Sequence, residues 1–136
     1  MKKYLLDTNI CISIIRNKYG VPDKLKSVGK RHCYVSEISI AELYYGASKS
    51  KRENKRYEDV ELIRENFKII PISECVFKFG QIKADLEIKG QRLDDFDLLI
   101  GVTALTHNLV MVSDNIKHLG RIPGIKIENW TQRNEE

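Results

Sequence analysis

Short apolar runs alternate along the chain with longer segments in which apolar residues recur every three or four positions. The short runs have the length and composition of β-strands, and they cover residues 3–6, 32–36, 67–72, 109–113 and 125–130. The run at 109–113, LVMVS, is almost continuously apolar. Such a run is typical of a strand that is buried on both faces of a parallel sheet.

The segments between these runs have the periodicity of amphipathic helices. They lie after Asp7, over 22–29 up to Gly29, behind Ser39, over 60–67, over 76–86 up to Gly90, and over 98–105. Strands that alternate with helices predict an α/β fold, with a mostly parallel sheet and helices on both faces. We therefore expect a single domain over 1–130 and a polar C-terminal tail over 131–136.

Composition narrows the class of protein without identifying it. The 136 residues are the usual size of one domain, and 42% are hydrophobic, which is enough for a substantial core. A net charge of +4 is compatible with a polyanionic partner. No apolar run approaches the ~20 residues of a membrane-spanning helix, and no signal-peptide pattern is present. We expect a cytoplasmic protein.

The three cysteines, Cys11, Cys33 and Cys75, do not suggest a disulfide framework or a zinc site. Their number is odd and none belongs to a C-x-x-C pair. They are expected to be small buried residues with free thiols.

Four acidic residues are predicted to meet at one edge of the sheet. Asp7 and Asp114 directly follow the first and fourth strands, and Glu42 lies in the first turn of the helix after the second. Asp97 lies in the first turn of the helix that leads back into the fourth strand. The carboxyl ends of parallel strands share one edge, where α/β proteins bind their ligands.

Each acid also has a purely structural interpretation. Asp7 could cap a helix, Glu42 could complete a capping box with Ser39, Asp97 could be the partner of an Asp94 cap, and Asp114 could form an Asx turn. Independent caps and turns give no reason for all four acids to gather at the same edge. Their joint placement favours a functional cluster.

A cluster of carboxylates requires a counter-charge. Two like charges ~4 Å apart repel by roughly 4 kcal/mol at an effective dielectric constant of 20, and each raises the other's pKa. A divalent cation removes this penalty, and ligands that are all oxygen favour Mg²⁺ or Mn²⁺. Such ions activate water and stabilise charge on phosphate oxygens, which suits phosphodiester hydrolysis.

At this point the sequence resembles a known family, the PIN-domain ribonucleases, and more narrowly the VapC-type toxins of bacterial toxin–antitoxin pairs. The resemblance covers about Leu5 to Trp130 and rests on YLLDTNICISII, SEISIAELYYGA, DDFDLLIGVTAL, LVMVSDN and RIPGIKIENW. It implies an α/β/α sandwich and an endoribonuclease that depends on Mg²⁺ or Mn²⁺ and often cuts tRNA or rRNA. It also implies a homodimer and an antitoxin protein that covers the active site.

The resemblance assigns roles to the acids. The family's first acid, glutamate and third acid fall on Asp7, Glu42 and Asp97. Asp7, Asp97 and Asp114 are expected to hold one or two metal ions. Glu42 is expected to position or deprotonate the attacking water, and cleavage would leave 5′-phosphate ends.

The fourth position departs from the family pattern. The family often has an aspartate where this chain has Asn115, and the acid Asp114 comes one residue earlier. Charge favours Asp114 as the fourth site residue, whereas register favours Asn115. The polar residues Thr8, Asn9, Ser113 and Asn115 are expected to orient ligands or water.

A basic segment, KSKRENKR, provides candidate RNA contacts at Lys49, Lys51, Arg52, Lys55 and Arg56. These side chains could form a rim that binds phosphates. The alternative is an ordinary solvated helix surface.

Two other phosphoryl-transfer classes fit the sequence poorly. A phosphoacceptor signalling domain would need an acidic pair after an early strand and a lysine after a late one. A haloacid-dehalogenase-type phosphatase would need an aspartate where Asn9 stands. A catalytically inactive PIN-fold module that binds RNA or protein remains the alternative.

Overall fold

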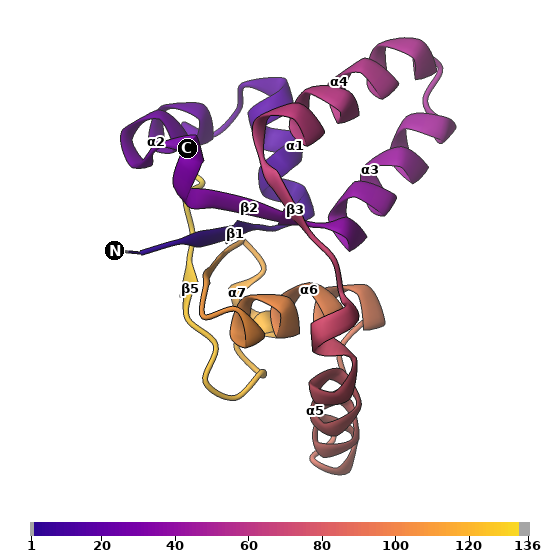
Figure 1. The fold of residues 1–136 in the computed structure, drawn as a ribbon, viewed down its shortest axis with the longest axis vertical. Helices are drawn as coiled ribbons and strands as arrows, with labels where there is room; N and C mark the ends of the chain where they lie inside the picture. Colours follow the sequence, from indigo (N-terminus) through magenta and orange to yellow (C-terminus); the bar gives the residue numbers. More distant parts are fainter. Residues whose placement is uncertain (1, 134–136) are drawn as a thin grey trace.

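The computed structural model describes residues 2–133, which form a central sheet between two layers of helices (Figure 1). The strands are β1 (Tyr4–Leu6), β2 (Cys33–Ser36), β3 (Lys68–Ile70), β4 (Val110–Val112) and β5 (Ile127–Glu128). The α-helices are α1 (Thr8–Arg16), α2 (Val21–Val28), α3 (Glu37–Lys49), α4 (Glu53–Asn66), α5 (Val76–Ile88), α6 (Asp95–Thr106) and α7 (Ile116–Leu119). Two 3₁₀ turns, η1 (Lys30–His32) and η2 (Ser73–Cys75), precede β2 and α5.

All pairings in the sheet are parallel, and the strand order is β3-β2-β1-β4-β5. β2 and then β3 are added on one side of β1, and β4 and then β5 are added on its other side. The topological switch therefore lies between β1 and β4, the place where α/β sheets open a crevice beyond the strand ends.

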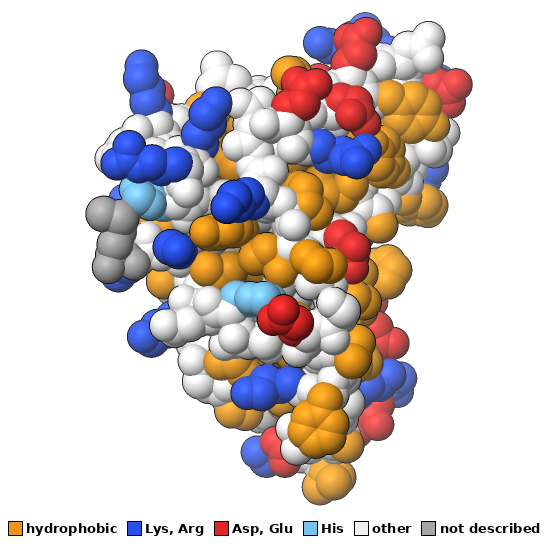
Figure 2. All heavy atoms as spheres, in the orientation of Figure 1, with side chains coloured by type: hydrophobic (Ala, Val, Ile, Leu, Met, Phe, Trp, Pro, Cys, Tyr) orange, Lys and Arg blue, Asp and Glu red, His pale blue; other side chains and the backbone are white. Residues whose placement is uncertain are grey.

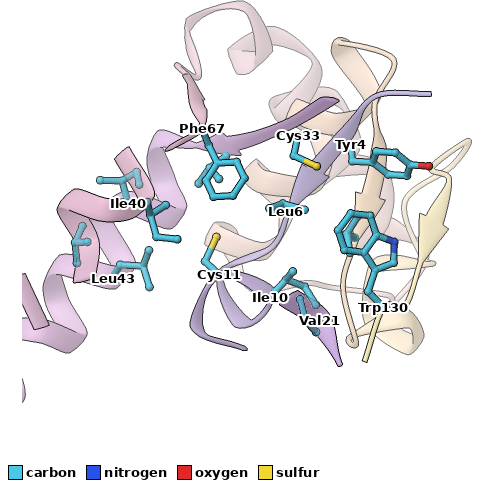
Figure 3. Packing of buried hydrophobic residues seen from close by; sticks show 14 of the residues in the cluster. Tyr4, Leu6, Ile10, Cys11, Val21, Cys33, Ile40, Leu43, Phe67 and Trp130 are labelled. Atoms are coloured by element: carbon cyan, nitrogen blue, oxygen red, sulfur yellow. The ribbon is translucent and has the colours of Figure 1, made fainter. Parts of the chain in front are cut away.

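Alternate residues of β1 enter two separate hydrophobic cores. Tyr4 and Leu6 face the layer of α1–α4, whereas Leu5 faces the layer of α5–α7. Figure 3 shows the first core, with Trp130 beside Tyr4 and with Cys11 and Cys33 among the apolar side chains. The three cysteines are buried and free, as expected. The α/β sandwich predicted from the sequence is confirmed.

Several local predictions need correction. The capping box of Ser39 and Glu42 is wrong, because α3 begins at Glu37 and its cap is Ser36, whose Oγ accepts a hydrogen bond from Ile38 N. Ser39 is therefore inside the helix and fully buried. β2 also starts one residue later than expected, because His32 belongs to η1.

The C-terminal segment is attached to the domain beyond its predicted boundary. Trp130 is only 4% exposed and packs edge-on against Tyr4, with ring centroids 5.2 Å apart. Gln132 N donates a hydrogen bond of 2.7 Å to Tyr19 O. Residues 131–133 of the predicted tail thus pack on the domain, and 134–136 lie outside the described residues.

Large hydrophobic side chains are exposed at several places on the surface. Figure 2 shows them over the α3–α4 hairpin and toward the end of α5. Val76, Phe77 and Ile88 of α5 are between 57% and 86% exposed, so the predicted amphipathic face of this helix is only partly buried. Within residues 2–133 none of the helices combines the length and apolarity of a membrane span.

We predict that Trp130→Ala lowers the free energy of unfolding by about 3–5 kcal/mol, the usual cost of deleting a buried aromatic side chain. Tyr45, which is 66% exposed, provides the matched control. Tyr45→Ala should change the stability by no more than about 0.5 kcal/mol. Urea denaturation of both variants measures the difference, and equal costs would contradict this assignment of the core.

Candidate active site

Asp7 occupies the carboxyl end of β1 and is only 5% exposed. Its Oδ1 accepts a hydrogen bond of 2.8 Å from Thr8 N, which caps α1, and its Oδ2 accepts one of 2.7 Å from Ser113 Oγ. Burial raises its pKa, and Asp114 raises it further, against the lowering effect of these two hydrogen bonds. The capping role and the place in an acidic cluster are therefore both correct for this residue.

Glu42 is held in the cluster by a residue of α1. Thr8 Oγ1 donates a hydrogen bond of 2.6 Å to Glu42 Oε1 and lies 2.9 Å from Ser39 Oγ. Glu42 is in the second turn of α3, one turn later than predicted. Its pKa is raised by burial and by the neighbouring charges of Asp7 and Asp94.

Asp97 lies in the first turn of α6, as predicted. Burial and the charges of Asp7, Asp94 and Glu42 raise its pKa to about 6. Asp94 is the N-cap of α6, and its Oδ2 accepts from Phe96 N and Asp97 N. Asp94 was expected only as a cap, but the charge of its carboxylate also raises the pKa of Glu42 and Asp97.

The fourth position is divided between two side chains with different partners. Asp114 lies near enough to raise the pKa of Asp7, and its Oδ2 accepts a hydrogen bond of 2.9 Å from Arg133 Nη2. Asn115 Oδ1 instead lies 2.8 Å from His118 Nδ1 of α7. The structure thus brings Asp114 into the field of the cluster and pairs the Asn115 amide with α7. Which of the two serves as the fourth site residue stays a prediction.

The predicted supporting residues fall into two groups. Thr8 and Ser113 each donate a hydrogen bond to a cluster carboxylate, as expected of residues that orient ligands. Asn9 is exposed and has no hydrogen bond to these carboxylates within the described residues. Its contribution stays a prediction.

The donor set fits a hard divalent cation, although it does not form a closed cage. The cluster offers carboxylate oxygens whose mutual repulsion would be relieved by positive charge. Within residues 2–133 no three acidic, histidine or cysteine side chains converge closely enough to enclose an ion. Mg²⁺ does not require such a cage, because it usually keeps several waters and binds one or two carboxylates.

Glu42 also borders a pocket of about 150 Å³ between α1, α3 and α4. The walls are mainly apolar, from residues such as Ile12, Leu43 and Val60, and Arg16 and Arg56 contribute cationic side chains. An apolar cavity therefore adjoins the acidic cluster directly.

The residues of the predicted basic rim have two different surroundings. Arg56 Nη1 lies 2.9 Å and Lys55 Nζ 3.8 Å from the carboxylate of Asp59, which is 6% exposed. These two cations balance a buried charge. Lys49, Lys51 and Arg52 lie at the turn between α3 and α4 and are exposed.

Comparison with known proteins identifies the family. The model of the PIN domain matches residues 4–124. Ribonuclease VapC2 of Rickettsia felis is 38% identical and covers 93% of this chain and 97% of its own length. The tRNA(fMet)-specific endonuclease VapC of Salmonella typhimurium is 35% identical, with 96% and 99% coverage.

Solved structures agree with the sequence comparison. DNA-bound VapBC from Salmonella typhimurium contains a chain that superimposes with a TM-score of 0.88 at 33% identity. The superposition covers 96% of this chain and 99% of that one. Nucleases with PIN domains generally depend on divalent metal ions. The chain belongs to the PIN-domain family and, within it, to the VapC ribonucleases, which confirms the endoribonuclease predicted from the sequence.

Proposed function

We propose that this protein is the toxin of a toxin–antitoxin pair and cuts tRNA with the help of Mg²⁺ or Mn²⁺. The observation that carries the proposal is an acidic cluster at the switch between β1 and β4, in which burial and the charges of Asp7 and Asp94 raise the pKa of both Glu42 and Asp97. The choice of tRNA is supported by the 35% identical relative that is named as a tRNA(fMet)-specific endonuclease. Its place of action would be the cytoplasm.

The acidic residues are proposed to have different roles in hydrolysis. Asp7, Asp97 and Asp114 are the proposed ligands of one or two divalent cations, which they would bind directly or through water. When bound, such a cation supplies Lewis-acid activation of water and stabilises negative charge on the phosphate oxygens. Asp7 is fixed in place by Thr8 N and Ser113 Oγ, so it would present its remaining lone pairs in one orientation.

Glu42 is the proposed general base. Its Oε1 is occupied by Thr8, and within the described residues its Oε2 makes no hydrogen bond. The raised pKa improves a carboxylate as a proton acceptor near neutral pH. Glu42 would take a proton from the attacking water, and cleavage would leave a 5′-phosphate.

The acidic cluster also argues against the alternative of an inactive binding module. Ionised carboxylates of Asp97 and its neighbours repel one another above pH 6. A module that bound RNA without a metal would gain nothing from this arrangement, and the same charges would repel its ligand.

We propose an antitoxin and a second copy of the chain as protein partners. A basic side chain of the antitoxin could replace the cation among the carboxylates, while the apolar pocket beside Glu42 could receive a hydrophobic one. The exposed Val76, Phe77 and Ile88 of α5 offer a surface for a homodimer. The proposed antitoxin is supported by the VapBC complexes among the structural relatives.

We predict that Asp97→Asn abolishes cleavage and raises the melting temperature in metal-free buffer at pH 8. The pKa of Asp97 is raised to about 6 in the folded protein, so its ionised form destabilises the fold above that pH. Between pH 6 and the usual value near 4 the wild type gains protons on folding, and the difference between the two proteins should shrink at pH 5. Thermal melts at both pH values measure it.

The matched control is Asp95→Asn in the same turn of α6. Asp95 is exposed and pairs with Lys83 at 3.0 Å outside the cluster. The Asp95→Asn variant should therefore leave cleavage nearly unchanged.

Mn²⁺ at 100 times its Kd should stabilise the wild type by about 2.7 kcal/mol and should stabilise Asp97→Asn less. Loss of stability in Asp97→Asn, with no effect of metal on the wild type, would make Asp97 a structural residue only.

We predict that Asp114→Asn weakens metal binding and cleavage more than Asn115→Ala does. Asp114 contributes an anionic oxygen near Asp7, whereas the Asn115 amide is engaged with His118. Cleavage should be measured at limiting and at saturating Mn²⁺, because excess metal partly compensates for a lost ligand. A nearly silent Asp114→Asn beside a damaging Asn115→Ala would assign the fourth position to Asn115.

We predict that replacing Lys49, Lys51 and Arg52 together with Ser flattens the salt dependence of RNA binding. Each phosphate contact to a single strand contributes about 0.7 to the slope of log K against log salt, so three contacts would remove about 2. Arg56→Ser is expected instead to destabilise the fold, because Asp59 would lose its closest cation. An unchanged slope in the triple variant would show that these three residues belong to an ordinary solvated surface and do not contact RNA phosphates.

A further inference from the structure

The C-terminal segment carries an arginine to the edge of the acidic cluster. After the buried Trp130, Gln132 N is tied to Tyr19 O at 2.7 Å. The next side chain, Arg133, lies with its guanidinium carbon 4.1 Å from the centre of the Tyr19 ring. Its Nη2 donates a hydrogen bond of 2.9 Å to Asp114 Oδ2. Backbone, ring and carboxylate together fix its position.

This placement is not explained by stability. The side chains of Arg133 and Asp114 are 53% and 23% exposed, and ion pairs with such exposure contribute little to folding. The tyrosine and the carboxylate instead hold a flexible side chain in one orientation. Fixing it before binding lowers the entropy lost when a ligand is bound.

The position of Arg133 matters because of what surrounds it. Asp114 follows Ser113, whose hydroxyl donates to Asp7, so the guanidinium stands at the border of the cluster. The acids of the cluster repel the phosphates of an approaching RNA. A fixed cation at the border would counteract this repulsion beside the scissile bond.

The guanidinium also has unused binding capacity. It carries five N–H donors, and within the described residues only one hydrogen bond, to Asp114, is formed. The planar fork matches two oxygens of a phosphate, and the side chain is 53% exposed beside the Tyr19 ring.

We propose that Arg133 is a substrate-positioning residue that binds an RNA phosphate adjacent to the scissile one, with Tyr19 as its support. The proposal rests on the proposed ribonuclease function and adds a residue outside the acidic cluster. Arg133 takes no part in the bond-breaking step. It places the RNA so that the scissile phosphate faces Asp7 and Glu42.

The test is RNA binding in metal-free buffer, where cleavage cannot interfere. End-labelled bulk tRNA is titrated with full-length protein in EDTA at several salt concentrations. Arg133→Gln should weaken binding about tenfold, as expected for one charge-assisted contact, and lower the salt slope by about 0.7. Arg133→Lys should keep most of the salt slope and regain only part of the affinity, because lysine lacks the planar fork.

Two further variants separate positioning from charge and folding. Arg31→Gln removes the same charge from η1, which directly precedes β2 and so lies at the amino ends of the parallel strands, whereas the acids lie at the carboxyl ends. This control should change tRNA affinity less than twofold.

Tyr19→Leu keeps Arg133 but removes the aromatic ring beneath its guanidinium, so tRNA affinity should fall severalfold. With Mg²⁺, Arg133→Gln should raise KM and largely preserve kcat, and its melting temperature should match that of the wild type.

The outcomes are distinguishable. Equal tRNA affinity and salt slope in Arg133→Gln and wild type would overturn the proposal, and so would a loss of affinity matched by Arg31→Gln. A fall in melting temperature with unchanged affinity would also overturn it, since Arg133 would then be a structural tie. If the wild type itself showed neither tRNA binding nor metal-dependent cleavage, the ribonuclease function would fail first.

Discussion

The parallel pairing of β1 with β4 is the constraint on which the site depends. Asp7 N donates to Val112 O at 2.9 Å, which extends the ladder by one residue beyond β1. This pairing brings Ser113 Oγ to within 2.7 Å of Asp7 Oδ2, although the two residues are 106 positions apart in the sequence. A shift of register by one residue would move Leu5 and Leu6 each into the core that the other now occupies. It would also separate Asp7 from Ser113.

The local and functional roles of the acids are complementary. Asp7 uses one oxygen to cap α1 and the other to bind Ser113, and Asp94 caps α6 while adding to the field at Asp97. Helix N-termini carry partial positive charge, so they are favourable places for carboxylates that repel one another. The fold can therefore hold an acidic cluster before any cation arrives.

The sequence predicted the parts of this structure that follow from periodicity. Runs of alternating or continuous apolar residues predicted the parallel sheet. The shared edge of parallel strands then predicted a cluster of Asp7, Glu42, Asp97 and Asp114. Reading Ser39 and Glu42 as a capping box failed, because Ser36 sits at the exact end of β2 and caps α3 first. The same error concealed the contact of Thr8 with Ser39 and Glu42, which depends on the packing of α1 against α3.

Other features lay beyond sequence reasoning because they depend on long-range contacts. The pairing of Arg56 with Asp59 could have been suspected from their i, i+3 spacing on a helix. The path of residues 131–133 could not, since a polar segment of low periodicity gives no sign that it returns to Tyr19. α7 was missed because four residues, Ile116–Leu119, are too few for a helical period to be recognised.

The buried cysteines have a consequence for how the protein responds to oxidants. Burial raises the pKa of Cys33 to about 11 and raises that of Cys11 still further, with Asp7 adding to the effect at Cys11. Only the thiolate reacts readily with peroxides and disulfides, and at pH 7 about one Cys33 thiol in ten thousand would be ionised. Thiol oxidation of Cys11 and Cys33 therefore requires the first core to open. In the folded state, these two thiols therefore offer oxidants very little thiolate to react with.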